Sequence, residues 1–137
     1  MILVDTGPVV AAASPSDDHH VACLGALSEL RGPGLLITPF CALEVCYFLS
    51  LKASARAEAA FVRSLADGTF QLTEITREDL ERIADLIETY ADLGLGAADA
   101  SVVATAERLG IAQVLTLDRR HFSVVRPRHV NTFELLP

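Results

Sequence analysis

Four carboxylates stand where apolar or small neighbours would penalise an isolated charge: Asp5, Glu44, Asp99 and Asp118. Two of them end apolar runs, one interrupts an apolar stretch, and one lies among alanines. Burying a carboxylate is unfavourable unless something offsets its charge. A divalent cation does so, and ligands that are all oxygen favour hard ions such as Mg²⁺ or Mn²⁺. The pattern therefore predicts a metal-dependent reaction on a phosphate ester.

Each carboxylate also has a purely structural interpretation. Asp5 can cap the helix that follows it, and Asp99 or Asp118 can serve as a helix cap or turn residue. Glu44 can form a salt bridge. The joint pattern of four such acids is more specific than any one of them, so the prediction depends on their meeting in one place.

The elements that must position these acids alternate between strand and helix. Apolar runs predict strands over residues 2–4, 35–38, 70–74 and 113–117. Periodicity and capping signals predict helices over residues 16–30, 39–51, 55–66, 77–93 and 97–109. Such alternation is typical of a parallel sheet with helices on both faces.

The helix boundaries follow from particular residues. Ser16 or Asp17 can cap the first helix, which ends before the turn at residues 32–34. Thr38 before Pro39 is a helix-start signature, because the hydroxyl accepts a free amide hydrogen and proline has none to offer. Thr76 precedes the helix over residues 77–93. The spacing of its apolar residues predicts a buried face made of Leu80, Ile83, Ala84, Ile87, Tyr90 and Ala91.

The expected fold is an α/β domain spanning residues 1–137, a three-layer α/β/α sandwich around a mostly parallel sheet. Asp5 and Asp118 would then lie at the carboxyl ends of strands, where ligands bind in open α/β sheets. Glu44 and Asp99 fall in the first turns of their helices. If the strands that end near Asp5 and Asp118 are neighbours, all four acids can converge.

Composition excludes several classes. The chain is 51% hydrophobic with a mean hydropathy of +0.38, so whole-chain disorder is excluded. No apolar run is long enough to cross a membrane, and the N-terminus lacks the basic residues of a signal peptide, which predicts a cytoplasmic protein. Three cysteines without metal-knuckle spacing are expected to be reduced core thiols: Cys23, Cys41 and Cys46.

The charge is unevenly distributed. The net charge of −7 disfavours a protein held on nucleic acid by bulk positive charge. From Arg119 onward, however, there are four arginines and a single acid, so contact with a polyanion should favour the C-terminal part. Tryptophan is absent and only eight residues are aromatic, which favours recognition of RNA by its shape over base stacking.

At these acids the sequence resembles the PIN-domain ribonucleases, and within them the VapC-type toxins of bacterial toxin–antitoxin pairs. The resemblance covers nearly the whole chain, and its motifs are the opening Ile2-Leu3-Val4-Asp5-Thr6-Gly7, the helix of Glu44, the segment around Asp99, and Leu115-Thr116-Leu117-Asp118-Arg119-Arg120-His121-Phe122. It implies the acidic quartet Asp5, Glu44, Asp99 and Asp118, a divalent metal, and endonucleolytic cleavage of RNA that leaves a 5′-phosphate and a 3′-hydroxyl. It also implies a cognate antitoxin and a homodimer.

Within this scheme we expect Asp5 and Asp99 to ligate the principal Mg²⁺, with Mn²⁺ as a substitute. Glu44 and Asp118 would bind through water or complete a second, weaker site. One departure from the family is that Gly7 follows Thr6, where many members carry a second hydroxyl residue.

Supporting roles are expected for four more residues. Thr6 and Thr116 can donate hydrogen bonds to the ligands from a second layer, and Arg119 or Arg120 can reach a substrate phosphate. The alternatives are an ordinary turn role for the two threonines and a solvated basic turn for the two arginines. The histidines at positions 19, 20, 121 and 129 are expected to have surface or capping roles.

An apolar excess on two successive helices suggests an interface: Tyr47, Phe48, Leu49, Leu51, Phe61, Val62 and Leu65. The alternative is ordinary core packing.

The rival function is a catalytically silent PIN-like interaction domain. A response receiver is disfavoured because the single lysine, Lys52, falls in a helical segment, and a haloacid-dehalogenase-type phosphatase because Gly7 stands where its second aspartate is needed.

Overall fold

The computed structural model describes residues 1–32 and 34–137, so Pro33 of the expected turn at residues 32–34 lies outside the described residues. The strands are β1 (Ile2–Val4), β2 (Leu35–Ile37), β3 (Gln71–Leu72), β4 (Gln113–Leu115) and β5 (Glu134–Leu136). The helices are α1 (Thr6–Ala12), α2 (His20–Glu29), α3 (Pro39–Lys52), α4 (Ala55–Ala66), α5 (Arg77–Thr89), α6 (Ala97–Leu109) and α7 (Arg119–Val124), with a short 3₁₀ helix η1 (Ala91–Leu93) after α5.

The five strands form one parallel sheet in the order β3-β2-β1-β4-β5. Leu3 pairs with Leu36 on one side and with Val114 on the other, and all three side chains are buried. Short apolar strands buried on both faces are typical of parallel sheets covered by helices. The predicted α/β fold with a parallel central sheet is confirmed.

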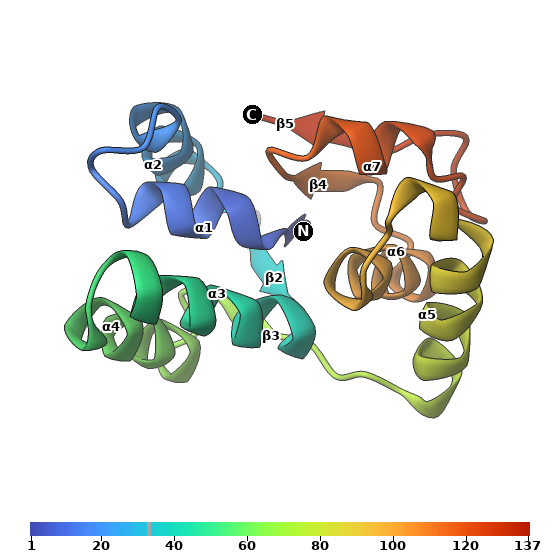
Figure 1. Cartoon of the computed structure of the whole chain (residues 1–137), viewed down its shortest axis with the longest axis horizontal. Helices are drawn as coiled ribbons and strands as arrows, with labels where there is room; N and C mark the ends of the chain where they lie inside the picture. The colour runs from blue at the N-terminus through green and yellow to red at the C-terminus, as the bar shows by residue number, and fades with distance from the viewer. Residues whose placement is uncertain (33) are drawn as a thin grey trace.

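The helices lie in two layers. Figure 1 shows α1–α4 on one side of the sheet and α5–α7 on the other. Right-handed crossovers explain this division, because the chain moves outward from β1 to β3 and then returns past β1 to reach β4. The strand order therefore reverses between β1 and β4, which is where open α/β sheets bind ligands.

Several predicted boundaries are confirmed by their caps. The Thr38 hydroxyl accepts a hydrogen bond from the amide of Cys41 at 3.2 Å and starts α3. Thr76 and Asp79 form a reciprocal capping box at the start of α5. Gly110 ends α6 in the left-handed region with φ of +69°, where a side chain would be strained.

The N-terminal part differs from the prediction. Residues 6–12 form helix α1, which was not among the predicted helix ranges although Asp5 was considered as a helix cap. Helix α2 begins at His20 without a side-chain cap from Ser16 or Asp17. Asp5 caps α1 by accepting a hydrogen bond from the amide of Thr6 at 2.7 Å. Pro8 is compatible with this helix because first-turn amides need no intrahelical acceptor.

The predicted buried face of α5 is also partly wrong. Leu80 is 50% exposed, whereas Asp79, Ile83 and Leu86 are buried. The cause is electrostatic: Asp79 accepts hydrogen bonds from the Arg108 guanidinium of α6, and this pair turns Asp79 inward. The helix also ends at Thr89, after which the chain continues as η1.

The C-terminal elements α7 and β5 were not predicted, and β4 ends at Leu115 rather than at residue 117. Asp118 caps α7 by accepting the amide hydrogen of His121 at 3.0 Å.

Cys23, Cys41 and Cys46 are free thiols, as expected, with Cys46 only half-buried. Within the described residues, the helices are too short or too polar to traverse a lipid bilayer.

Candidate active site

A cleft of about 800 Å³ opens at the carboxyl edge of the sheet, beside the point where the strand order reverses between β1 and β4. All four acids singled out from the sequence line it: Asp5, Glu44, Asp99 and Asp118. They come from four separate stretches, the ends of β1 and β4 and the N-terminal halves of α3 and α6. Glu44 lies in the second turn of α3, one turn later than expected.

Asp5 forms the floor of this cleft and is only 5% exposed. One carboxylate oxygen accepts the amide hydrogen of Thr6 at 2.7 Å, and the other accepts the hydroxyl hydrogen of Thr116 at 2.7 Å. The pKa of Asp5 is raised to about 6; burial is the largest cause, the nearby charges of Asp99 and Glu44 act in the same direction, and the two hydrogen bonds oppose the shift. An ionised Asp5 is therefore unfavourable unless a cation lies beside it.

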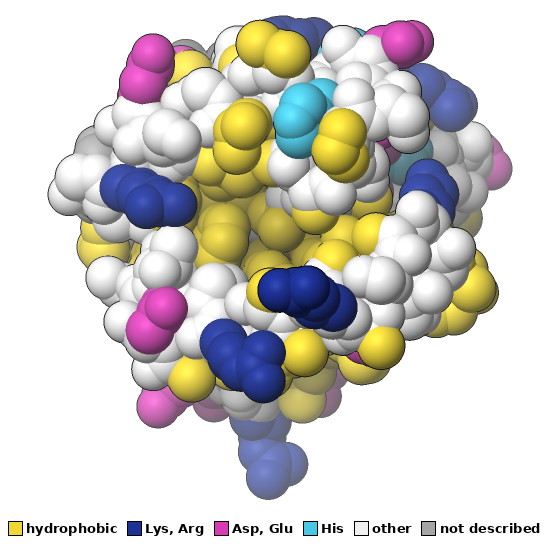
Figure 2. Space-filling model, turned by 90° about the vertical axis from the view of Figure 1, so that its left-hand side faces the viewer, with side chains coloured by type: hydrophobic (Ala, Val, Ile, Leu, Met, Phe, Trp, Pro, Cys, Tyr) yellow, Lys and Arg dark blue, Asp and Glu magenta, His cyan; other side chains and the backbone are white. Residues whose placement is uncertain are grey.

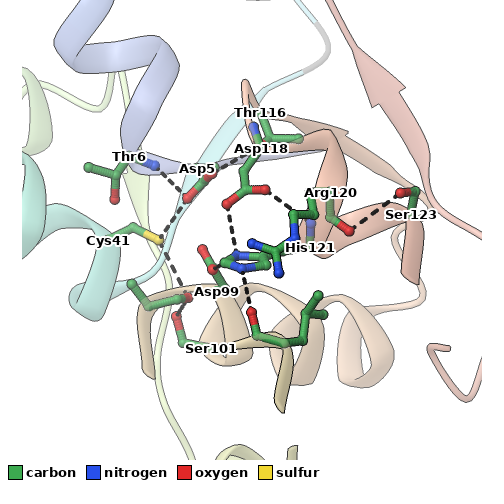
Figure 3. A network of polar contacts seen from close by, with 12 residues as sticks. Asp5, Thr6, Cys41, Asp99, Ser101, Thr116, Asp118, Arg120, His121 and Ser123 are labelled. Atoms are coloured by element: carbon green, nitrogen blue, oxygen red, sulfur yellow. Dashed lines mark hydrogen bonds and ion pairs between the residues drawn. The ribbon is translucent and has the colours of Figure 1, made fainter. Parts of the chain in front are cut away.

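Thr116 and Thr6 support Asp5 in different ways (Figure 3). The Thr116 hydroxyl also accepts the amide hydrogen of Asp118 at 2.9 Å, so it joins two of the acids. Thr6 contributes its backbone amide, and its buried hydroxyl has no hydrogen-bond partner among the described residues. Of the two threonines expected to support the ligands, only Thr116 does so through its side chain.

Asp99 and Asp118 meet around the ring of His121 (Figure 3). His121 Nδ1 lies 2.7 Å from Asp99 Oδ2 and 2.8 Å from Asp118 Oδ2. Burial raises the pKa of Asp99, and the charges of Asp118 and Glu44 add to this, while the contact with His121 lowers it. Ligand atoms of these three residues lie within 4.8 Å of one another, a spacing that suits a metal ion.

A fully buried thiol lies behind the cleft, next to Asp5. Cys41 Sγ lies 3.9 Å from Asp5 Oδ1 and 3.7 Å from the carbonyl oxygen of Ala98. Burial raises the pKa of Cys41 to about 12, and the charge of Asp5 contributes in the same direction. The thiol is therefore protonated and unreactive, and it acts as a weak hydrogen-bond donor.

The donor set fits a hard divalent cation. Across residues 1–32 and 34–137, the side chains of Asp5, Glu44 and Asp99 form no ion pair with an arginine or lysine. Carboxylate oxygens are what Mg²⁺ and Mn²⁺ prefer, and the raised pKa of Asp5 shows that the protein alone does not compensate its charge. The residues present thus match the ion that the sequence predicts.

The comparisons with known proteins agree with this geometry. Residues 2–126 match the PIN domain family. The chain belongs to the PIN-domain family. It is 30% identical to Ribonuclease VapC26 of Mycobacterium tuberculosis over 136 residues, which is 99% of this chain and 100% of that protein.

Solved structures show the same PIN-domain fold. The Mycobacterium tuberculosis toxin VapC20, described as cleaving the sarcin-ricin loop, has a TM-score of 0.76 at 18% identity, covering 83% of this chain and 87% of that one. VapBC2 of Rickettsia felis, solved with a DNA fragment from its promoter, has a TM-score of 0.69 at 16% identity and covers both chains fully. The resemblance to PIN-domain proteins of the VapC type is confirmed.

The PIN-domain cleft has cations on two sides. Arg119 and Arg120 of α7 line one rim, and Lys52 at the end of α3 lines the same cleft. The Lys52 ammonium lies 5.2 Å from the centre of the Phe48 ring, a cation–π contact. Arg119 donates to the backbone carbonyl of Pro137 at 2.6 Å, whereas no side-chain contact of that kind holds Arg120 within the described part of the chain.

His121 is the site residue that sequence reasoning missed, since it was assigned a surface or capping role. It lies three residues after Asp118, and residues three apart share one face of a helix. That spacing was the available signal. Because α7 was not expected, this spacing was not used to place residues 118 and 121 in one helical turn.

Proposed function

We propose that this chain is a Mg²⁺-dependent endoribonuclease that acts in the cytoplasm as the toxin of a toxin–antitoxin pair. The observation that carries the proposal is the convergence of Asp5, Glu44, Asp99 and Asp118 in one cleft. The similarity to a protein named Ribonuclease VapC26 supports RNA as the substrate. The buried Asp5 carboxylate, whose pKa is raised to about 6, favours an active site over a catalytically silent PIN-like domain, because groups with shifted pKa values cluster at functional sites.

In this proposal Asp5 and Asp99 bind the principal Mg²⁺ directly, and Glu44 and Asp118 bind it through water or complete a second site. A bound divalent ion supplies activation of water and neutralisation of charge during attack on phosphorus. Thr116 and the Thr6 amide hold Asp5 in one orientation. The buried floor around Asp5 excludes bulk water, which strengthens these electrostatic interactions.

The RNA substrate would be contacted by the basic side chains at the edges of the cleft, Arg119, Arg120 and Lys52. Arg120 is the better candidate of the two arginines for a phosphate contact, because the Pro137 carbonyl already occupies Arg119. Lys52 would contact the strand on the other side of the acids, with its position favoured by Phe48. An RNA strand crossing from Lys52 to Arg120 would pass over Asp5 and Asp99.

The antitoxin would bind a second, apolar groove. Figure 2 shows an apolar hollow on the side of the molecule that Figure 1 shows at the left. A groove of about 310 Å³ lies there among α1, α2, α3 and α4, and its lining includes Val9, Leu24, Leu27, Leu49 and Phe61. We expect an apolar antitoxin segment in it. A Leu24→Asp change should weaken antitoxin binding, measured by calorimetry, without loss of cleavage by the free toxin.

The homodimer would use a stripe on α3. Leu43, Tyr47 and Leu51 are 59–73% exposed and lie four residues apart, so they share one helical face. Leu49 and Phe61, which the sequence had grouped with the interface, are buried in the core instead. Light scattering of Tyr47→Lys should show a monomer, and an unchanged mass would exclude this stripe as the dimer contact.

The decisive experiment is to incubate purified protein with total cellular RNA, with and without Mg²⁺, and to map new 5′-phosphate ends by ligation. We expect Mg²⁺-dependent ends from the wild type and none from Asp5→Asn or Asp99→Asn. Asp85→Asn, an exposed acid on α5, is the control and should cleave normally. Cleavage by both cleft variants would show that the ligands are wrong, and an inactive wild type would favour the silent interaction domain.

A further inference from the structure

His121 makes four contacts that tie three separate elements of the cleft together. Its ring Nδ1 lies between the carboxylates of Asp99 and Asp118, at 2.7 and 2.8 Å. Its Nε2 lies 3.1 Å from the backbone carbonyl oxygen of Leu93 in η1. Its own backbone amide donates to the second oxygen of Asp118 at 3.0 Å. One residue of α7 thus engages α6, η1 and the end of β4.

The contacts at Nδ1 have a defined direction. Ionised carboxylate oxygens only accept hydrogen bonds, so Nδ1 is the donor in its hydrogen bond with Asp99 Oδ2, whereas Asp118 Oδ2 lies beside the same nitrogen as an ion-pair contact. Without the His121 ring between them, the carboxylates of Asp99 and Asp118 would repel each other. The His121 side chain is 16% exposed, so its ring is held among these partners by packing as well as by hydrogen bonds.

Asp118 depends on His121 more than Asp99 does. Both Asp118 oxygens contact His121, one at the backbone amide and the other at the ring. The Asp118 side chain is 37% exposed, so packing alone leaves it free to rotate toward solvent. The contact of the ring with Leu93 fixes the wall of the cleft next to Gly94, which lines the same cleft.

We propose that His121 is a positioning residue that sets the spacing and orientation of Asp99 and Asp118 for metal binding. This inference rests on the proposed function, because it assumes that the two acids serve a divalent ion. Residues that hydrogen-bond to metal ligands typically change metal affinity 10- to 100-fold when they are removed. His121 does not touch the substrate or the ion in this scheme.

The test is the affinity for Mn²⁺, measured by calorimetry on the metal-free protein, so it needs no turnover. His121→Leu removes the ring contacts with Asp99, Asp118 and the Leu93 carbonyl, keeps the backbone amide, and should weaken Mn²⁺ binding about 10- to 100-fold. His121→Asn keeps an N–H near the position of Nδ1 and should stay within about threefold of the wild type. His121→Gln reaches toward Leu93 instead and should not rescue. His129→Leu, whose ring contacts the carbonyl of Ile111 away from the cleft, is the control.

The outcomes separate this inference from the proposed function. A wild type that binds no Mn²⁺ overturns both. A wild type that binds Mn²⁺ with the same affinity as His121→Leu, or more weakly, overturns only the positioning role. If His121→Leu fails to fold, pulsed electron paramagnetic resonance of the Mn²⁺-loaded wild type still decides, because a strong coupling to a ring nitrogen would make His121 a ligand instead.

Discussion

The Thr116 hydroxyl lies 2.7 Å from a carboxylate oxygen of Asp5, although the two residues are 111 positions apart in the chain. The pairing of β1 with β4 places them side by side, since Val4 is in register with Leu115. The same hydroxyl accepts the amide hydrogen of Asp118. One side chain at the point where the strand order reverses therefore connects two of the four acids.

Replacing Thr116 with valine or serine should separate the effect of its hydroxyl group on stability and metal affinity from the effect of side-chain packing. Thr116→Val leaves the buried Asp5 carboxylate and the Asp118 amide without their partner, which should cost about 1–3 kcal/mol of unfolding free energy. Mn²⁺ affinity should fall about tenfold or more. Thr116→Ser keeps the hydroxyl and should retain the affinity. Urea unfolding and calorimetry measure both quantities, and wild-type Mn²⁺ binding by Thr116→Val would contradict the expected role.

The raised pKa of Asp5 predicts a pH-dependent cost of folding. Because the pKa is 3.8 in the unfolded chain and about 6 in the folded protein, the folded state binds more protons between these values, and stability falls as pH rises through this window. The cost above pH 6 is on the order of 3 kcal/mol. Metal-free Asp5→Asn should therefore be more stable than the wild type at pH 7.5, and the gap should shrink toward pH 4.

Asp67→Asn is the matched control, and the pH dependence of its effect on stability should have the opposite sign. Hydrogen bonds from Thr69 lower the pKa of Asp67. The ionised Asp67 therefore stabilises the folded protein above the pKa of the unfolded chain, and this stabilisation is lost as pH falls. Urea unfolding in the presence of a chelator measures both variants. An Asp5→Asn protein that is less stable than the wild type at pH 7.5 would contradict the assignment of Asp5 as a desolvated charge.

Divalent metal should stabilise the protein in a pH-dependent manner. At a concentration 100 times the dissociation constant, an ion that binds only the folded state adds about 2.7 kcal/mol. For a domain of this size the melting temperature should rise by roughly 10 °C. The rise should be larger at pH 7 than at pH 5, because protons compete for Asp5 in its window below about pH 6. Calorimetric melting with Mg²⁺ tests this, and an unchanged melting temperature would count against a metal site.

The two arginines on the rim should differ in RNA binding. Arg120→Gln, placed in an Asp99→Asn background to prevent cleavage, should weaken binding and reduce the salt dependence by about one phosphate contact. Arg119→Gln should have the smaller effect, because the Pro137 carbonyl holds that side chain. Filter binding over a series of salt concentrations gives both slopes. Equal slopes for the two variants would show that neither arginine is preferred.

The four acids could be singled out from the sequence because each stands in an environment that makes a charge costly. Asp5 ends a buried strand, and Asp99 lies among small residues at the start of α6. The capping alternative for Asp5 and Asp118 is also true, since both cap helices while lining the cleft. Local pattern thus predicted the positions of these residues, and capping accounts for part of their local hydrogen bonding.

Other features had no sequence signal. The inward turn of Asp79 depends on Arg108, 29 residues away, and the periodicity of α5 alone favoured Leu80 instead. The short helix α7 and the edge strand β5 were missed for another reason: α7 has six residues and β5 has three, which is too few to show a periodic pattern. Because α7 was missed, the contacts of His121 with Asp99 and Asp118 were missed as well.

What the sequence by itself determined is the alternation of the first four strands with the longer helices, the caps at Thr38 and Thr76, and the four acids. Those features depend on propensities and burial within a few neighbouring residues. Only the tertiary structure decided that β1 and β4 are neighbours, that Asp99 and Asp118 share His121, and which arginine is free at the rim. These depend on chain crossovers and on contacts between distant residues, which the local pattern of side chains does not encode.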